Sequence, residues 1–313
     1  MNALLIHYYY PPIRSGAVLR NYYFSREFSQ YFDQVYVLTT DNRQMLAQEP
    51  LPLPDNVTVL EAKTFDYRRW IGNQTSSHLP EEKKQKPLLT WLGKLMKTLP
   101  FHFIMGEGGL LYIFSAVRIG KKLIKAKKID FIYSSFGPYA DHFIAYTIKG
   151  KNKQLPWVAD FRDLQVEPLY RNVFLRKWQV AIERFLLRRA NLVTTISDGL
   201  KKHLEIYGRP VMSVPRGVKM HAGKKETFDK FTICYTGSLY QDYRDANLFF
   251  SELARLLDQG HIERSSIQFI YAGRDSGQFS HWIQQYGLED CFVNRGFLTR
   301  EETLNLQRRS HLQ

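Results

Sequence analysis

The chain has 313 residues, of which 44% are hydrophobic and 14% aromatic. This length suggests two domains of roughly 150 residues each, and the apolar content excludes a mainly disordered chain. Lys and Arg (44) outnumber Asp and Glu (30), which gives a net charge of +14. A field of this sign attracts nucleic acid, anionic lipid headgroups or phosphorylated small molecules, and charge alone does not choose among them.

The cysteines and the N-terminus bear on localisation. Cys234 and Cys291 each fall in an apolar run, which favours buried thiols in a reducing compartment over a disulfide framework or a metal site. No basic segment precedes a long apolar stretch at the N-terminus, and the longest apolar run, near 108–117, is too short to span a bilayer. We therefore expect a cytoplasmic protein, or one at the inner face of the cell membrane.

Short strands and helices are predicted to alternate over residues 1–218, which we interpret as the N-terminal domain. A helix with Phe24, Phe28, Tyr31 and Phe32 on one side follows the first strand. Apolar runs predict strands at 3–6, 35–38, 57–60, 131–133, 157–159, 192–196 and 211–214. This order is typical of an α/β domain whose parallel sheet is covered on both faces.

Two basic stretches accompany this alternation. Between Lys83 and Lys128 there are eleven Lys or Arg and one acid, Glu107, interleaved with Trp91 and Leu95. This pattern predicts docking on an anionic membrane surface through 83–128, and a solvated basic face is the alternative. The stretch 175–189 has apolar residues at helical spacing among arginines, and we interpret it as a surface helix.

A polar segment, 219–230, predicts a linker to a second, Rossmann-like α/β series over 231–313. Strands are predicted at 231–235, 267–271 and 291–293, and the capping-box spacing of Thr299 and Glu302 predicts one more helix. Three strands are about half of those in a complete doubly wound domain. The second domain is therefore expected to be partial.

The loop from Pro11 to Gly16 is the first candidate site. It joins the first strand to the first helix, where Gly16 would let the backbone approach a ligand. The helix N-terminus that follows favours phosphate. An ordinary tight turn explains the same residues.

The second candidate site follows the strand at 157–159. Asp160, Arg162 and Asp163 lie at its carboxyl end, which is where open α/β sheets place their ligands. A carboxylate could act as the base and Arg162 could clamp a phosphate or carboxylate. The alternative is a structural salt-bridge cluster.

The second domain carries a similar pattern. Gly237 and Ser238 follow its first strand, Arg244 precedes the next helix, and Gly273 follows the second strand. Backbone N–H groups at Gly237 and Ser238, together with the Arg244 cation, would suit a diphosphate. Two successive strands that end in glycine indicate a rim that faces a ligand.

His142 is a further catalytic candidate. It lies near the start of a predicted helix, where an imidazole could act on an acceptor hydroxyl. The alternative is a histidine exposed on the helix surface.

Five pieces in order resemble the GT-B glycosyltransferases of the family-four type. They are Pro11 to Arg20, Ala159 to Asp163, Thr195 to Ser197, Pro215 to Val218 and Tyr235 to Leu239. The resemblance implies two Rossmann-like domains that face a cleft, with the acceptor held mainly by the first and the sugar nucleotide by the second. It also implies transfer with retention and no metal or other cofactor. The chain contains no Asp-x-Asp triplet of the kind that holds a divalent ion on a diphosphate.

The chain departs from that family's pattern in the donor half. The family has Gly followed by Arg or Lys where this chain has Gly237 and Ser238, so Arg244 is expected to supply the cation. The family's pair of acidic residues seven positions apart is not reached before Gln313.

Three functions therefore remain open. The first is a glycosyltransferase that moves a sugar from a nucleotide donor to a polysaccharide or lipid-linked glycan acceptor. The second is an impaired, C-terminally truncated fragment with weak donor binding, because the acidic pair would orient the donor. The third is a basic nucleic-acid-binding protein, and we expect no nucleic-acid partner because the basic residues form no known recognition motif.

Overall fold

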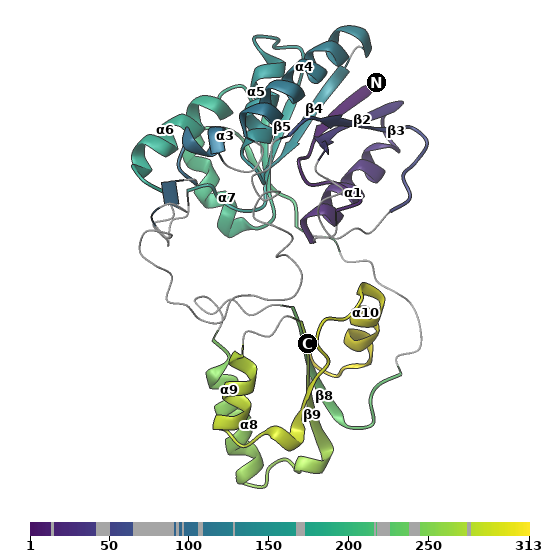
Figure 1. Ribbon diagram of the computed structural model, residues 1–313, viewed down its shortest axis with the longest axis vertical. Helices are drawn as coiled ribbons and strands as arrows, with labels where there is room; N and C mark the ends of the chain where they lie inside the picture. The colour runs from purple at the N-terminus through teal and green to yellow at the C-terminus, as the bar shows by residue number, and fades with distance from the viewer. Residues whose placement is uncertain are drawn as a thin grey trace. The chain divides into compact units, whose positions relative to one another are not determined.

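The computed structural model describes residues 1–13, 16–41, 51–64, 91, 94–95, 97–105, 109–127, 129–166, 173–215, 217, 226–237, 245–273 and 277–313. Contacts between the described residues separate two compact units, one that extends to Gly217 and one formed by residues from 226 onward. Each unit is an α/β layer structure with its own sheet (Figure 1).

The first unit is built on a parallel sheet in the order β3-β2-β1-β4-β5-β6-β7. Its strands are β1 (Asn2–Ile6), β2 (Gln34–Thr40), β3 (Val57–Ala62), β4 (Ile129–Ser135), β5 (Trp157–Phe161), β6 (Leu192–Thr195) and β7 (Val211–Ser213). The strand order reverses between β1 and β4, which pair directly. Ligands of open α/β sheets bind at the carboxyl ends of the strands beside such a switch point.

Helices cover both faces of this sheet. They are α1 (Gly16–Phe28), α3 (Phe101–Met105), α4 (Leu110–Lys127), α5 (Ala140–Lys149), α6 (Arg176–Leu187), α7 (Asp198–Leu204) and the short η3 (Glu205–Tyr207). Alternate residues of β1 divide between the faces: Leu4 and Ile6 pack with α4 and α5, whereas Ala3 and Leu5 pack with the side that carries Phe24 of α1.

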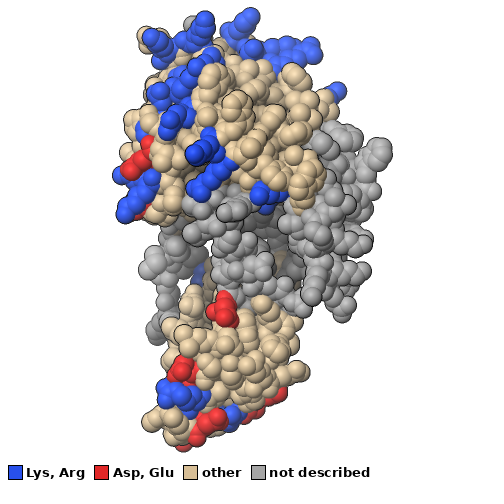
Figure 2. Space-filling view, turned by 90° about the vertical axis from the view of Figure 1, so that its left-hand side faces the viewer, with Lys and Arg blue, Asp and Glu red and all other residues tan. Residues whose placement is uncertain are grey.

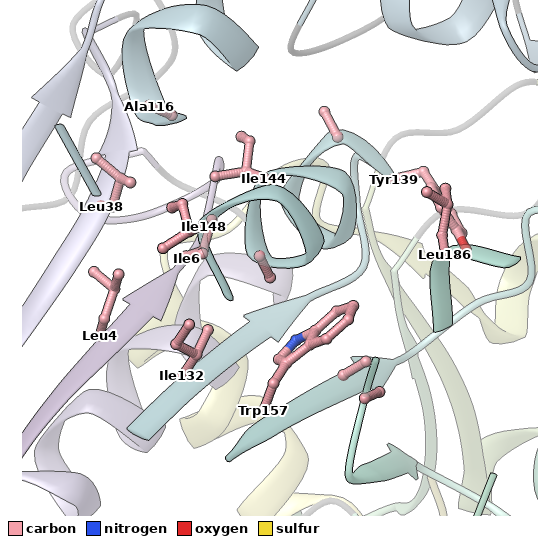
Figure 3. Close-up of a cluster of buried hydrophobic side chains, with 14 of the residues drawn as sticks. Leu4, Ile6, Leu38, Ala116, Ile132, Tyr139, Ile144, Ile148, Trp157 and Leu186 are labelled. Atoms are coloured by element: carbon pink, nitrogen blue, oxygen red, sulfur yellow. The ribbon is translucent and has the colours of Figure 1, made fainter. Parts of the chain in front are cut away.

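The larger core lies between the sheet and the helices α4 to α6. Figure 3 shows Leu4, Ile6 and Ile132 of the strands directed toward Ile144 and Ile148 of α5. Trp157 is fully buried, and its indole Nε1 donates to Ser134 Oγ at 2.8 Å, so the ring's polar atom is satisfied inside the core. This packing fixes the carboxyl ends of β4 and β5 relative to each other.

The second unit repeats the β-α-β pattern with three described strands, in the parallel order β10-β9-β8. Its elements are β8 (Phe231–Thr236), α8 (Asn247–Asp258), η4 (Arg264–Ser266), β9 (Ile267–Ala272), α9 (Gln278–Gln285), η5 (Glu289–Cys291), β10 (Phe292–Asn294) and α10 (Arg300–Arg309). The predicted capping box is confirmed, since Thr299 and Glu302 satisfy each other's backbone N–H groups at the start of α10.

Several expectations on individual residues are settled by this fold. Cys234 and Cys291 are both free and buried, as predicted. The expectation that Tyr31 belongs to the first helix is wrong: α1 ends at Phe28, Tyr31 lies in the following turn, and the tyrosine is 75% exposed. Within the part of the chain that the structure describes, no helix has both the length and the apolar character needed to cross a membrane.

Candidate functional site

Asp160 is the centre of a buried polar cluster at the carboxyl end of β5. Its carboxylate is fully buried and accepts hydrogen bonds from Arg20 of α1, at 3.1 Å from Nη2 to Oδ1 and 3.4 Å from Nε to Oδ2. Thr194 Oγ1 of β6 donates at 2.7 Å and Ser135 Oγ of β4 at 3.4 Å. The cluster therefore joins three neighbouring strands and α1 through one carboxylate.

A second buried guanidinium lies beside this pair. Arg162 is 8% exposed, and its Nη2 donates to the carbonyl of Phe136 at 2.9 Å. Burial is the main cause that lowers the pKa of Arg162 from its usual value, and the charge of Asp160 counteracts it. A Cβ at Gly137, where φ is +104°, would lie 3.4 Å from Arg162 Nη2. The backbone after β4 thus passes closely over the guanidinium, as a glycine allows.

His7 follows β1 at the switch point and faces the two arginines. The imidazole is fully buried, and within the described residues neither ring nitrogen has a hydrogen-bond partner. Burial, with the positive charges of Arg162 and Arg20, lowers the pKa of His7 to about 3. A neutral imidazole with two unpaired nitrogens in a protein interior is unusual and is explained if a ligand uses them.

The loop that carries His7 is fixed by side chains from three elements. Asp141 of α5 accepts from the Tyr8 amide at 2.8 Å, Thr39 Oγ1 of β2 donates to the Tyr8 carbonyl at 3.0 Å, and Asn21 Nδ2 of α1 donates to the Tyr9 carbonyl at 2.8 Å. Burial raises the pKa of Asp141 to about 7, against the hydrogen bonds that its carboxylate accepts from the Tyr8 amide and the Tyr112 hydroxyl. Held in this way, the loop presents its groups from a rigid scaffold.

His142 is the third residue of α5, and its side chain is buried in the core. The alternative of an exposed histidine on a helix surface is therefore wrong. The ring is fully buried at 4.5 Å from the Phe161 ring, and Nδ1 shares a 2.8 Å hydrogen bond with Ser134 Oγ. Burial, with a smaller contribution from Arg162, lowers the pKa of His142 to about 3. Its Nε2 has no partner among the described residues, and its catalytic role remains a prediction.

The other candidates of the first unit are Asp163 and Gly16. Asp163 follows β5 and is exposed, so it is the accessible carboxylate of the Asp160–Asp163 motif. Gly16 is the first residue of α1. The loop residues Arg14 and Ser15, which precede it, lie outside the described residues.

In the second unit, the glycines after β8 and β9 form one continuous rim. Gly237 N donates to the Ala272 carbonyl at 2.9 Å, and Gly273 N donates to the Gly296 carbonyl at 2.8 Å. A Cβ at Gly273 would lie 2.0 Å from the Gly237 carbonyl oxygen. These two N–H groups are thus used to close the rim, and Ser238 and Arg244, the predicted diphosphate contacts beside them, lie outside the described residues.

Sequence reasoning singled out Asp160 and Arg162 but missed the groups that complete the cluster, namely His7, Arg20, Tyr133 and Thr194. Tyr133 faces the cluster from β4, and burial, together with the charge of Asp160, raises its pKa well above the usual value. The signal for His7 was available, because a titratable residue that directly follows the first strand of a parallel sheet lies at its ligand-binding edge.

The buried guanidinium groups of Arg20 and Arg162 bring hydrogen-bond donors and positive charge to this edge of the sheet, beside the carboxylate of Asp160. Thr195 Oγ1 adds another buried polar atom without a partner among the described residues. The same described residues contain no group of His, Cys, Asp or Glu placed to hold a metal ion.

The fold defines the class of protein: two Rossmann-like α/β units, the architecture of GT-B glycosyltransferases. Comparison with solved structures shows this likeness over 99% of the chain. Sucrose-phosphate synthase from Thermosynechococcus elongatus matches with a TM-score of 0.58 at 12% identity, and 73% of that chain is covered. The predicted fold, with a second unit of few strands, is confirmed.

Two further glycosyltransferase structures match over 99% of this chain. One is the lipopolysaccharide outer core galactosyltransferase WaaB, with a TM-score of 0.56 at 12% identity over 72% of that chain. The other is a glycosyltransferase from Rickettsia africae, with a TM-score of 0.53 at 11% identity over 71% of that chain. No model of a protein family and no curated protein matches the chain. At these identities the likeness shows the fold.

Proposed function

We propose that this chain is a glycosyltransferase that transfers a sugar from a nucleotide donor to a polysaccharide or lipid-linked glycan acceptor, with retention of configuration. The observation that carries the proposal is the buried Arg20–Asp160–Arg162 cluster, with His7, at the switch point of a GT-B fold. Buried guanidinium groups at the carboxyl edge of a parallel sheet can hold a substrate anion through charge-assisted hydrogen bonds.

Arg162 is the residue we assign to the substrate anion. Its guanidinium is buried beside the Arg20–Asp160 pair, and Nη2 donates to the Phe136 carbonyl at 2.9 Å. Placed against a phosphate, it would stabilise the negative charge that develops on a leaving diphosphate. Asp160 then positions the arginines, and the exposed Asp163 is the carboxylate available for contact with an acceptor hydroxyl.

The second unit is proposed to hold the nucleotide sugar at the carboxyl ends of β8 and β9. Support comes from the rim at Gly237 and Gly273, where a Cβ at Gly273 would lie 2.0 Å from the Gly237 carbonyl oxygen. The phosphate contacts would then come from Ser238 and Arg244. No metal is part of the proposal, because the guanidinium groups supply the positive charge.

A panel of nucleotide sugars tests this function. Each donor is incubated with the purified chain, and both binding and release of the nucleoside diphosphate are measured. We expect one donor class to bind saturably, and the matching free nucleoside diphosphate to compete with it. Absence of binding by every donor, with the chain shown to be folded, would contradict the proposal.

Arg162→Gln identifies the site within that assay. The amide keeps a hydrogen-bond donor for the Phe136 carbonyl but removes the charge, so we expect donor affinity or turnover to fall at least tenfold. The matched control is Arg255→Gln, which removes an exposed arginine of α8 paired with Glu252 at 2.8 Å. Equal effects of the two substitutions would remove Arg162 from the site.

A further inference from the structure

Helix α6 presents an apolar stripe to solvent. Trp178 is 62% exposed and Phe185 is 50% exposed, and they lie seven residues apart, so they share one side of the helix. Leu175, immediately before the helix, is 75% exposed and has φ of +48°. A leucine rarely adopts this left-handed conformation, and here it holds a large apolar side chain in water.

A second set of exposed apolar residues adjoins the beginning of α6. Trp91 is 50% exposed, Phe101 41% and Ile104 48%. This segment is tied to α6 by two hydrogen bonds between the Gln179 side chain and the Leu99 backbone, at 2.6 and 2.9 Å. We call the combined surface, formed by Trp91, Phe101, Ile104, Leu175, Trp178 and Phe185, the α6 face.

Cationic side chains predominate around the α6 face, although the exposed Glu205 of η3 lies beside α6. Arg176, Lys177, Arg184 and Arg188 are exposed on α6, whereas Glu183, the helix's acid, is buried. Neither α3 nor α4 contains an acid, and α4 exposes Arg118, Lys121, Lys122 and Lys125. Figure 2 looks at this side of the molecule, and on the first unit Lys and Arg clearly outnumber Asp and Glu.

We propose that the α6 face docks on the surface of an anionic phospholipid membrane. Exposed Trp, Phe and Leu side chains enter the boundary between headgroups and acyl chains, while surrounding Arg and Lys side chains contact anionic headgroups. Charge complementarity selects this occupant, because a predominantly cationic rim around apolar residues matches a uniformly negative surface.

This surface overlaps the predicted docking region at 83–128, which supplies Trp91, Phe101 and Ile104, and extends it to Leu175, Trp178 and Phe185. Residues 65–90 lie outside the described residues, and α6 was expected to be an ordinary surface helix. The structure extends the apolar anchor to α6 and its neighbours, and the cationic side chains of α4 are an addition to it. The proposal does not depend on the glycosyltransferase function, because docking requires neither donor nor acceptor.

Vesicle co-sedimentation tests the α6 face, with the chain mixed with neutral phosphatidylcholine vesicles or with vesicles that also contain phosphatidylglycerol. We expect binding to the anionic vesicles only, and release at high salt. Trp178→Ser with Phe185→Ser should weaken that binding at least tenfold. The matched control is Tyr31→Ser with Leu248→Ser, which removes two apolar residues that are 75% and 73% exposed elsewhere.

The outcomes separate the alternatives. Loss of binding in the α6 variant and retention in the control support the proposal. Failure of the wild-type chain to bind anionic vesicles overturns it, as does unchanged binding of the α6 variant. Loss of binding only when Lys83, Lys84 and Lys86 are replaced would assign docking to the basic segment and would also overturn it. Circular dichroism verifies that both double variants are folded.

Discussion

Replacing Asp160 with Asn removes the carboxylate that pairs with Arg20 inside the first unit. The Arg20 and Asp160 side chains are 5% and 0% exposed, with 3.1 Å between Nη2 and Oδ1. After the change, Arg20 stays buried without its counter-charge, and an amide nitrogen can face its N–H groups. We expect a large loss of stability, because water cannot solvate the remaining guanidinium.

The magnitude follows from removal of one partner of a buried ion pair, which costs about 3–5 kcal/mol. In a unit of this size each kcal/mol corresponds to roughly 2–4 °C in Tm, so the variant should melt roughly 6–20 °C below the wild-type chain. Thr194 donates to Oδ1 and Ser135 to Oδ2 of Asp160, so the single amide oxygen of the variant can keep only one of these hydrogen bonds as it is, and the other adds to the loss.

Urea unfolding of the wild-type chain, Asp160→Asn, Arg20→Met and the double variant forms a double-mutant cycle. We expect each single variant to lose stability and the double variant to lose less than the sum, because it leaves no unpaired buried charge. A loss below about 1 kcal/mol for Asp160→Asn, the range of an exposed pair, would refute the buried ion pair. Strictly additive effects would refute the coupling.

Three further predictions concern pH and packing. Burial lowers the pKa of His7 and His142 to about 3. Below pH of about 6.5 the unfolded chain therefore binds more protons than the folded chain. The free energy of unfolding falls from that pH toward pH 3, by about 1.4 kcal/mol per pH unit for each histidine. His7→Gln should reduce this acid loss in urea titrations, and an unchanged slope would contradict the buried, neutral imidazole. Burial raises the pKa of Glu183 to about 8. The folded chain therefore holds a proton that the unfolded chain releases above the unperturbed pKa of about 4.3. The free energy of unfolding falls as the pH rises from there toward 8. Glu183→Gln should flatten that alkaline loss, and an identical pH profile would argue that the carboxyl is solvated. Gly273→Ala places a methyl group 2.0 Å from the Gly237 carbonyl oxygen, whereas a Cβ at Gly217 meets nothing within 4 Å. In thermal unfolding, we expect a clear fall in Tm for Gly273→Ala and little change for Gly217→Ala. Equal Tm values for the two variants would contradict the closed rim.

The strands of both units could be predicted because their residues form short apolar runs that are separated by turn and helix signals. All ten described strands overlap the runs at which strands were predicted. Boundaries were less certain: Tyr31 fits the periodicity of the first helix, but α1 ends at Phe28. Periodicity does not report where a tertiary contact ends a helix.

The candidate site was only half predictable for a related reason. The order of Asp160, Arg162 and Asp163 at a strand end is visible locally, and the carboxyl edge of a parallel sheet is where ligands bind. The partner of Asp160 is Arg20, 140 residues away, and no local pattern encodes that pairing. Gly237 shows the converse, because its predicted phosphate-binding N–H group donates to Ala272 instead.

The central claim is that this chain binds a nucleotide sugar and that Arg162 of the buried cluster takes part in that binding. Isothermal titration of the chain with a panel of nucleotide sugars, repeated with Arg162→Gln, tests it most directly. The account predicts saturable binding of one donor class, competed by its nucleoside diphosphate and weakened at least tenfold by the substitution. Absence of binding by the folded wild-type chain, or equal affinity in the variant, would contradict it.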